Sequence, residues 1–274
     1  MKTESAGLVA ALKWRLKSSF VRDTYWAVAR RERLESLRQQ LHFYEKVLVG
    51  FDRGGLIFDV GANIGDKTDL FLRLGARVIA VEPDDTCSAT LGYRFLKYRI
   101  MPRPLTVDKR AVSNQVGMVE MLVDGPASAV NTLSRKWAED LKKNKATFEH
   151  GHCGLEFTEV KKVQTTTLED LISKYGAPFF VKIDVEGHEL SALRGLHRPV
   201  PYISFETNLP EFRTEGVECI SVLQKLAPAG RFNYMSECVR GLRLEDWVSA
   251  EEMCAVLGQC TERSIEIFWK SSLV

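Results

Sequence analysis

The sequence lacks several features that would assign a protein to a particular class. It has no run of about 18 apolar residues, so no membrane-spanning helix is expected. Its 38 basic and 36 acidic side chains leave a formal net charge of only +2, which gives no reason to expect a nucleic-acid partner. Six cysteines occur without any C-x-x-C pair, a usage typical of reduced thiols rather than of a disulfide framework. We therefore expect a soluble, cytoplasmic protein, large enough at 274 residues for one α/β domain with additions.

The first 50 residues combine basic and apolar side chains at roughly helical spacing. This pattern predicts a basic amphipathic helical extension, followed by the main domain at residues 51–274. We favour helices that pack over the main domain. Contact with a membrane surface or with a partner is the alternative.

A glycine-rich turn separates a predicted strand at residues 56–60 from a helix that begins near Asp66. Its two glycines would let the backbone pass close to a bulky ligand, and the helix N-terminus behind them offers unpaired N–H groups. The spacing D-x-G-x-x-x-G differs from the G-x-G-x-x-G of a dinucleotide site, so a pyrophosphate ligand is disfavoured. The residues expected to form this cradle are Asp59, Gly61, Ala62, Asn63 and Gly65.

Acidic residues end the next two predicted strands. Glu82 follows the apolar run at residues 76–81, where a carboxylate can accept both hydroxyls of a ribose. An acid before the glycine turn and another after the second strand are typical of S-adenosylmethionine (SAM) sites, because SAM has a ribose but no phosphate. We therefore favour SAM over NAD or a turn without a ligand. Asp108, after a third strand, either touches the adenine or is an ordinary loop acid.

Ionisable residues also gather where the strand predicted at residues 179–183 ends, and another follows the apolar run at residues 202–205. The carboxyl ends of parallel strands meet at one edge of a sheet, where open α/β folds bind their ligands. We therefore expect Asp184 and Glu206 to lie on neighbouring strand ends, above the same crevice. The ionisable residues of the two segments are Lys182, Asp184, Glu186, His188 and Glu206.

Five segments follow one another in an order that is more specific than any one of them alone. They are FDVGANIGDKT, VIAVEPD, TTTLEDL, FFVKIDVEGHELSALRGL and ISFETN. Together they resemble the FkbM family of SAM-dependent methyltransferases over residues 56–208. The resemblance implies a class I methyltransferase fold, a doubly wound Rossmann-like α/β sheet that is mostly parallel with an antiparallel C-terminal strand. It also implies methylation of a hydroxyl on a small acceptor such as a sugar or a polyketide. By this analogy Asp184 would lie near the transferred methyl group, and SAM would be held by Asp59, Gly61, Asn63, Gly65 and Glu82.

An alcohol acceptor must lose its proton, and the candidate bases are Asp184, Glu206 and His188, with Lys182 able to steady an alkoxide. Asp184 and Glu206 could instead hold a divalent cation. Two carboxylates without an evident third ligand make a poor site, so no metal is expected. A cluster at residues 150–153 is expected to be a polar loop, since it has no partner pair at zinc-site spacing.

Two other functions stay open at this point. An NAD-linked oxidoreductase is disfavoured by the glycine spacing, and a non-catalytic scaffolding module is disfavoured by the acids at the strand ends. In the C-terminal third, strands near residues 232–235 and 264–269 suit the antiparallel closure of the sheet. Trp247 and Trp269 either line an acceptor pocket or, as is commoner for tryptophan, pack in the core.

Overall fold

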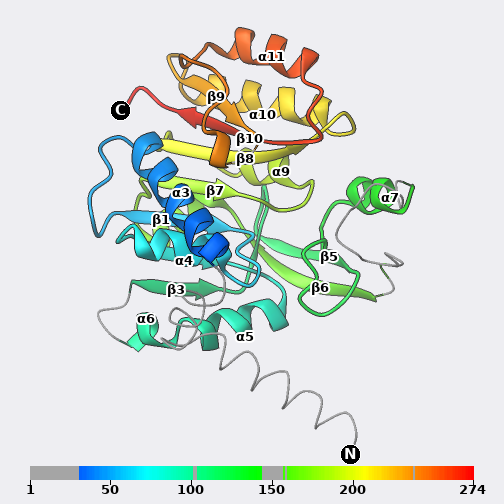
Figure 1. Ribbon diagram of the computed structural model, residues 1–274. Helices are drawn as coiled ribbons and strands as arrows, with labels where there is room; N and C mark the ends of the chain where they lie inside the picture. The colour runs from blue at the N-terminus through cyan, green and yellow to red at the C-terminus, as the bar shows by residue number, and fades with distance from the viewer. Residues whose placement is uncertain (1–30, 101–103, 144–156, 158, 237) are drawn as a thin grey trace, which may run out of the picture.

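The computed structural model describes residues 31–100, 104–143, 157, 159–236 and 238–274. Its central sheet is built from β1 (Leu56–Val60), β2 (Arg77–Val81), β3 (Leu105–Asp108), β7 (Phe180–Ile183), β8 (Tyr202–Asn208), β9 (Arg231–Met235) and β10 (Ser264–Lys270). The strand order is β3-β2-β1-β7-β8-β10-β9 (Figure 1). β10 is antiparallel to both of its neighbours, and the other adjacent strands are parallel. The predicted fold, mostly parallel with an antiparallel C-terminal strand, is confirmed.

Helices cover both faces of this sheet. One face packs under α3 (Arg31–Val47), α4 (Asp66–Arg73) and α5 (Asp85–Arg94), which α6 (Leu96–Ile100) follows. The other face packs against α8 (Leu168–Tyr175), α9 (Glu189–Arg194), α10 (Arg213–Leu226) and α11 (Ala250–Gln259). The apolar side chains of the strands divide between these two cores, as they must when both faces of a parallel sheet are buried.

Polar residues interrupt the face that α3 and α4 cover. Side chains at positions i and i+2 of a strand share a face, so Asp59, Lys182 and Ser204 point to the same side as the apolar residues two positions before them. The strand register pairs Asp59 with Lys182 and Lys182 with Ser204. Lys182 is only 4% exposed, and the other two have no exposed surface. A buried row of polar groups therefore crosses three strands near their carboxyl ends.

A second, three-stranded sheet lies beyond the carboxyl ends of the parallel strands (Figure 1). It consists of β4 (Ala111–Val112), β5 (Gly117–Val123) and β6 (Glu159–Thr166) in the order β4-β6-β5. Its small core joins Ala111, Met121 and Val163. The loop after β5 leads to α7 (Arg135–Lys143). This second sheet brings residues from the middle of the chain over the end of the main sheet.

The N-terminal helix α3 is part of the main core. Phe43, Tyr44 and Val47 are buried against the sheet and against α4. This agrees with the expected packing for that helix, but the rest of the predicted N-terminal extension lies outside the described residues, as does the segment at residues 150–153. The boundary at residue 50 stays a prediction.

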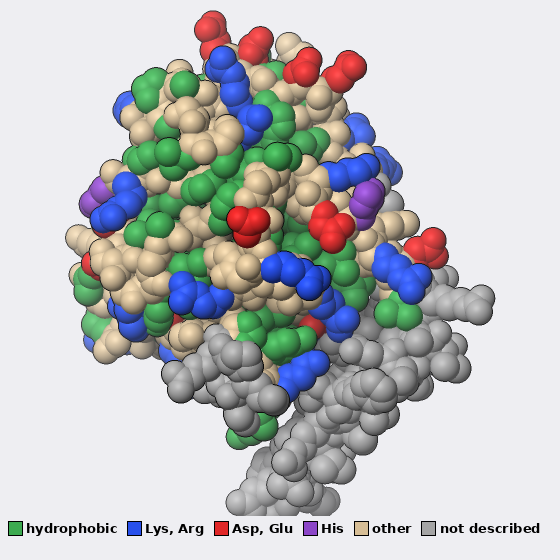
Figure 2. All heavy atoms as spheres, turned by 90° about the vertical axis from the view of Figure 1, so that its left-hand side faces the viewer, with side chains coloured by type: hydrophobic (Ala, Val, Ile, Leu, Met, Phe, Trp, Pro, Cys, Tyr) green, Lys and Arg blue, Asp and Glu red, His purple; other side chains and the backbone are tan. Residues whose placement is uncertain are grey.

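The membrane, cysteine and charge expectations can be compared with the described residues. In the described ranges, no helix combines the length and the apolarity needed to cross a membrane. The described cysteines Cys87, Cys219, Cys254 and Cys260 are free thiols, as is Cys238 in the short helix η1 (Cys238–Arg240). Figure 2 shows the side opposite the second sheet, where basic and acidic side chains are interspersed among apolar ones. On that face neither sign of charge dominates.

Candidate active site

A cavity of about 180 Å³ lies at the carboxyl ends of β1, β2 and β7. Its walls are the turn after β1, Glu82 and Pro83 after β2, residues 110–112 after β3, residues 184–186 after β7, and the segment 128–133 that follows β5. The cavity therefore lies at the edge of the sheet that the sequence predicted. Of the predicted site residues, those that line it are Gly61, Asn63, Glu82 and Asp184, and those that do not are Asp59, Ala62, Gly65, Asp108, Lys182, His188 and Glu206.

The turn after β1 has left-handed backbone at Gly61 (φ 80°), Asn63 (φ 47°) and Gly65 (φ 88°). A Cβ added to Gly61 would lie 1.7 Å from the carbonyl oxygen of Asp184, and one on Gly65 would lie 2.5 Å from Leu91 Cδ2. We had expected these glycines because they allow a ligand to approach the backbone closely. The structure adds a second reason, which is packing within the chain itself. Both are required because the chain packs so closely against itself at these points.

Asp59 anchors this turn from below. Its Oδ2 accepts a hydrogen bond of 2.5 Å from Thr68 Oγ1 in the first turn of α4, and its Oδ1 has no hydrogen-bond partner among the described residues. Burial raises the pKa of Asp59, and this effect outweighs the opposing influence of Lys182 and Thr68. Asp59 thus joins β1 to the first turn of α4.

Glu82 presents a buried carboxylate to the cavity. Its Oε2 accepts the backbone N–H of Asn63 and its Oε1 accepts that of Asp84, both at 2.8 Å. Burial raises the pKa of Glu82 to about 7, although both hydrogen bonds oppose the shift. Each carboxylate oxygen has a further lone pair for a ligand hydroxyl. The position matches the one expected of a ribose-binding acid.

Asp108 is engaged by neighbouring side chains. Arg110 Nε donates to its Oδ1 at 2.8 Å, Arg110 Nη2 donates to its Oδ2 at 2.6 Å, and Tyr175 Oη donates to Oδ2 at 2.9 Å. Burial would raise the pKa of Asp108, but these bonds outweigh it and hold the pKa well below its ordinary value. Arg110, which the sequence reasoning missed, lines the cavity, with its guanidinium held by this carboxylate.

Lys182 and Asp184 form an ion pair beside the cavity. Lys182 Nζ lies 2.6 Å from Asp184 Oδ2. Burial lowers the pKa of Lys182, but the charges of Asp184, Asp59 and Glu266 outweigh this effect and raise it. Burial in turn raises the pKa of Asp184, and Lys182 more than reverses the shift. Both groups are therefore charged around neutral pH, with the aspartate facing the cavity.

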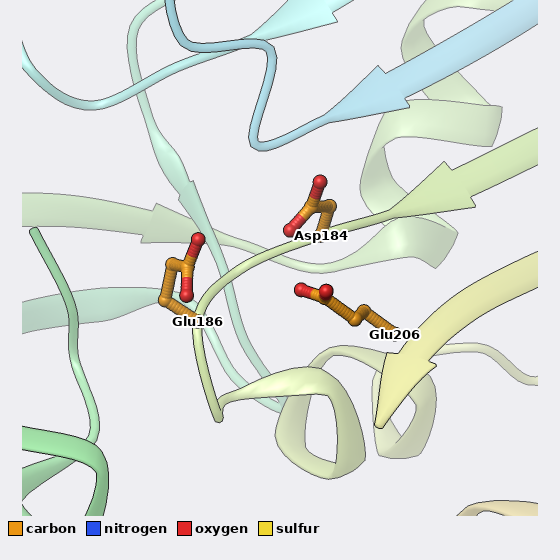
Figure 3. A group of neighbouring side chains, drawn as sticks. All are labelled: Asp184, Glu186 and Glu206. Carbon is orange, nitrogen blue, oxygen red and sulfur yellow. The ribbon is translucent and has the colours of Figure 1, made fainter. Parts of the chain in front are cut away.

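Glu186 and Glu206 complete a group of three carboxylates with Asp184 (Figure 3). One oxygen from each lies within 4.8 Å of the others. Burial first, and then the charge of Asp184, raise the pKa of Glu206 to about 8, while burial and both neighbouring acids raise the pKa of Glu186. Asp184 and Glu206 thus meet above one crevice, as expected, and Glu186 supplies the third carboxylate that the sequence reasoning did not place there.

His188 and the two tryptophans lie away from the cavity wall. His188 Nε2 is 3.1 Å from Ser113 Oγ, and burial lowers the pKa of His188 to about 4. Trp269 is fully buried in the core, and Trp247 packs against Tyr202 at the amino end of β8, with ring centroids 6.3 Å apart. Both tryptophans therefore have packing roles.

The segment that follows β5 forms a wall that sequence reasoning did not identify. Thr132 Oγ1 donates to the carbonyl oxygen of Glu186 at 2.6 Å, and Asn131 Nδ2 lies 3.4 Å from Asp84 Oδ2. These bonds connect it to the ends of β7 and β2. Only a Gly-Pro turn at residues 125–126 marks the segment in the sequence, and such a turn carries no information about a distant contact.

Comparisons with known proteins agree with this geometry. The family model described as the methyltransferase FkbM domain matches residues 59–231, more than half of the chain. A crystal structure of methyltransferase FkbM from Methylobacillus flagellatus KT is similar at 16% identity and a TM-score of 0.52, over 84% of this chain and 47% of that chain. This chain thus spans about half the length of that protein.

Two further solved structures are more distant. A TehB-like SAM-dependent methyltransferase from Corynebacterium glutamicum has 8% identity and a TM-score of 0.43, over 98% of this chain and 100% of that one. Precorrin-6y C5,15-methyltransferase from Geobacter metallireducens GS-15 has 10% identity and a TM-score of 0.41, over 87% of each chain. Similarities this weak add nothing to the assignment. A search among curated proteins found no match.

The family match begins at Asp59 and extends past Glu206, so it includes every strand end that contributes a wall to the cavity. From this match, the chain belongs to the FkbM family of SAM-dependent methyltransferases.

Proposed function

We propose that the protein transfers a methyl group from SAM to a hydroxyl of a small acceptor, such as a sugar or a polyketide. One observation carries the proposal. The cavity that Glu82 and the glycine turn enclose also has Asp184 in its wall, and Asp184 is ion-paired to the buried Lys182. A cofactor site and a group able to accept a proton therefore share one wall.

The side chains around the cavity fit an adenosine-containing cofactor. Glu82 has a lone pair on each oxygen for the ribose hydroxyls, in addition to those that accept backbone N–H groups. Arg110 offers a planar cation in a fixed orientation, which suits stacking on an adenine ring. In this proposal Arg110 contacts the adenine, and Asp108, which the sequence suggested for that contact, holds Arg110 in place. When bound, SAM supplies an electrophilic methyl group on a sulfonium that departs as a neutral thioether.

The acceptor hydroxyl must lose its proton as its oxygen is methylated. A hydroxyl on the cavity side of Asp184 can donate a hydrogen bond to this carboxylate, which Lys182 keeps ionised. The proton can then pass to the Asp184–Glu206 pair, and Lys182 stabilises the negative charge that develops nearby. Alignment of the two reactants and exclusion of water supply the rest of the catalysis.

His188 has no part in this proton transfer. Its imidazole is buried against Ser113, and its lowered pKa leaves it neutral at physiological pH. The contact joins β4 to the residue that precedes α9, so we assign His188 a structural role. Asp184 and Glu206 remain as the candidate bases.

The two rival functions have less support. The family match favours a methyltransferase over an NAD-linked oxidoreductase. A scaffolding module would have no need of a buried lysine paired with an aspartate in a cavity wall, since burying a charge is costly. The cytoplasmic location and the contact of the N-terminal helices with a membrane stay predictions.

Binding and turnover can be tested separately. Calorimetry with SAM, S-adenosylhomocysteine and NAD side by side should show binding of the first two only. Methylation is then assayed with SAM that carries a trideuterated methyl group against a panel of sugars and polyketides, and products are identified by mass. Binding of NAD without SAM would overturn the proposal, and methylation of nitrogen alone would overturn the hydroxyl acceptor.

A further inference from the structure

The carboxylates of Asp184, Glu186 and Glu206 converge where the loop after β7 meets the end of β8 (Figure 3). Three acids so close together repel one another, and Lys182 binds only Asp184. The side chain of Glu186 makes no hydrogen bond or ion pair with any other described residue. Among the described residues, no cation forms an ion pair with Glu186 or Glu206.

Buried polar atoms next to the group also lack partners. Asp59 and Tyr44 have no exposed surface, yet Asp59 Oδ1 and the Tyr44 hydroxyl form no hydrogen bond within the part of the chain that the structure describes. The Tyr44 ring packs edge-on against Phe71 of α4, with centroids 5.3 Å apart, and contacts Phe180 of β7, with centroids 5.9 Å apart. A buried polar atom without a partner costs about 1–3 kcal/mol, so such atoms usually face ordered water or an ion. Asp59 and Tyr44 both lie against β7, the strand that Asp184 follows.

We propose that Asp184, Glu186 and Glu206 bind one divalent cation, Mg²⁺ or Mn²⁺, at the acceptor side of the cavity. Ligand sets made only of carboxylate oxygen favour hard cations over zinc or copper. Such cations take about six ligands, so three carboxylates leave positions for water and for the acceptor hydroxyl. Asp184 can contribute while Lys182 holds its Oδ2, because a carboxylate has two oxygens.

The cation gives the acceptor site a chemical preference. A hydroxyl that binds a divalent cation has a lower pKa and is held in one position, so acceptors with two adjacent oxygens should bind best. This role rests on the proposed methyl transfer, whereas the binding of the cation does not. The proposed cation site replaces our expectation from the sequence that no metal binds here. That expectation considered only the two carboxylates of Asp184 and Glu206.

The test uses the whole chain after removal of metals with EDTA. Titration with Mn²⁺, followed by electron paramagnetic resonance, should show one ion per chain, and Mg²⁺ should displace it. Glu186→Gln and Glu206→Gln should each weaken binding of Mn²⁺ by at least about tenfold, since even residues behind metal ligands have effects of that size. Glu251→Gln is the matched control, because Glu251 is an exposed acid on α11. It should bind Mn²⁺ as the unaltered protein does.

The absence of saturable Mn²⁺ binding would overturn the site, as would binding that neither substitution weakens. Thermal unfolding without metal shows whether each variant is folded. If a variant is unfolded, the Mn²⁺ titration of the unaltered protein decides whether the cation site exists. Calorimetry with SAM in EDTA separates this inference from the proposed function. SAM binding without Mn²⁺ binding rejects only the cation site, and Mn²⁺ binding without SAM binding rejects only the methyltransferase.

Discussion

Gly61 offers a quantitative test of how the turn after β1 is built. An alanine there would have to adopt a left-handed backbone, which costs roughly 1–2 kcal/mol for a residue with a Cβ. Its Cβ would also lie 1.7 Å from the carbonyl oxygen of Asp184, so the turn and the end of β7 would have to separate by roughly 1.5 Å. Overpacking of this kind typically costs about 1–3 kcal/mol. Gly61→Ala should therefore destabilise the protein by about 2–5 kcal/mol.

Gly54→Ala is the control that isolates the steric part. Gly54 has a φ of 88°, close to the 80° of Gly61, but a Cβ on Gly54 would meet nothing within 4 Å. Only the backbone cost of about 1–2 kcal/mol should remain for this variant. Urea unfolding of both variants gives the two losses, provided that the slopes agree. Equal losses for the two alanines would refute the contact between Gly61 and Asp184 as the reason for the glycine.

The other predictions concern charged groups of the site. Glu82→Ala should weaken SAM at least about tenfold in a folded variant, because a hydrogen bond to a charged group contributes about 1.5–3 kcal/mol; a loss below about twofold in calorimetry would make Glu82 an ordinary acid. Burial raises the pKa of Glu82 to about 7 and a ribose binds its ionised form, so SAM affinity should fall as the pH is lowered from about 8 to about 6, and a flat profile would contradict this role. Asp184→Asn should lower turnover by about 10²–10⁴-fold with a much smaller effect on SAM affinity, and near-full turnover would leave Glu206 as the base. Lys182→Met should lower the free energy of unfolding by about 2–3 kcal/mol, less than for a fully buried pair, because Lys182 is buried but the Asp184 side chain is 35% exposed. Lys136→Met, which breaks the more exposed 2.6 Å pair with Glu215, should cost about 1 kcal/mol or less, and equal losses in urea unfolding would argue against burial as the cause.

Local sequence patterns determined much of this fold. Runs of apolar residues gave the positions of β1, β2 and β7, because buried parallel strands are apolar on both faces. The predicted cofactor acid Glu82 lines the cavity and the expected neighbours Asp184 and Glu206 come together, since the carboxyl ends of parallel strands share one edge of the sheet. These features follow from the order of strands and turns along the chain.

The tertiary structure alone decided which of these residues face the cavity. Strand register and side-chain alternation bury Lys182 on the sheet face that α3 and α4 cover, and Asp108 pairs with Arg110, which leaves the arginine in the cavity wall. The third carboxylate, Glu186, is held beside Asp184 by a bond from Thr132, more than 50 residues earlier in the chain. Local propensities carry no information about such distant contacts, because a contact of this kind depends on how separate elements pack. The sequence therefore determined the strand ends that build the site, and packing determined which side chains each strand end presents to the cavity.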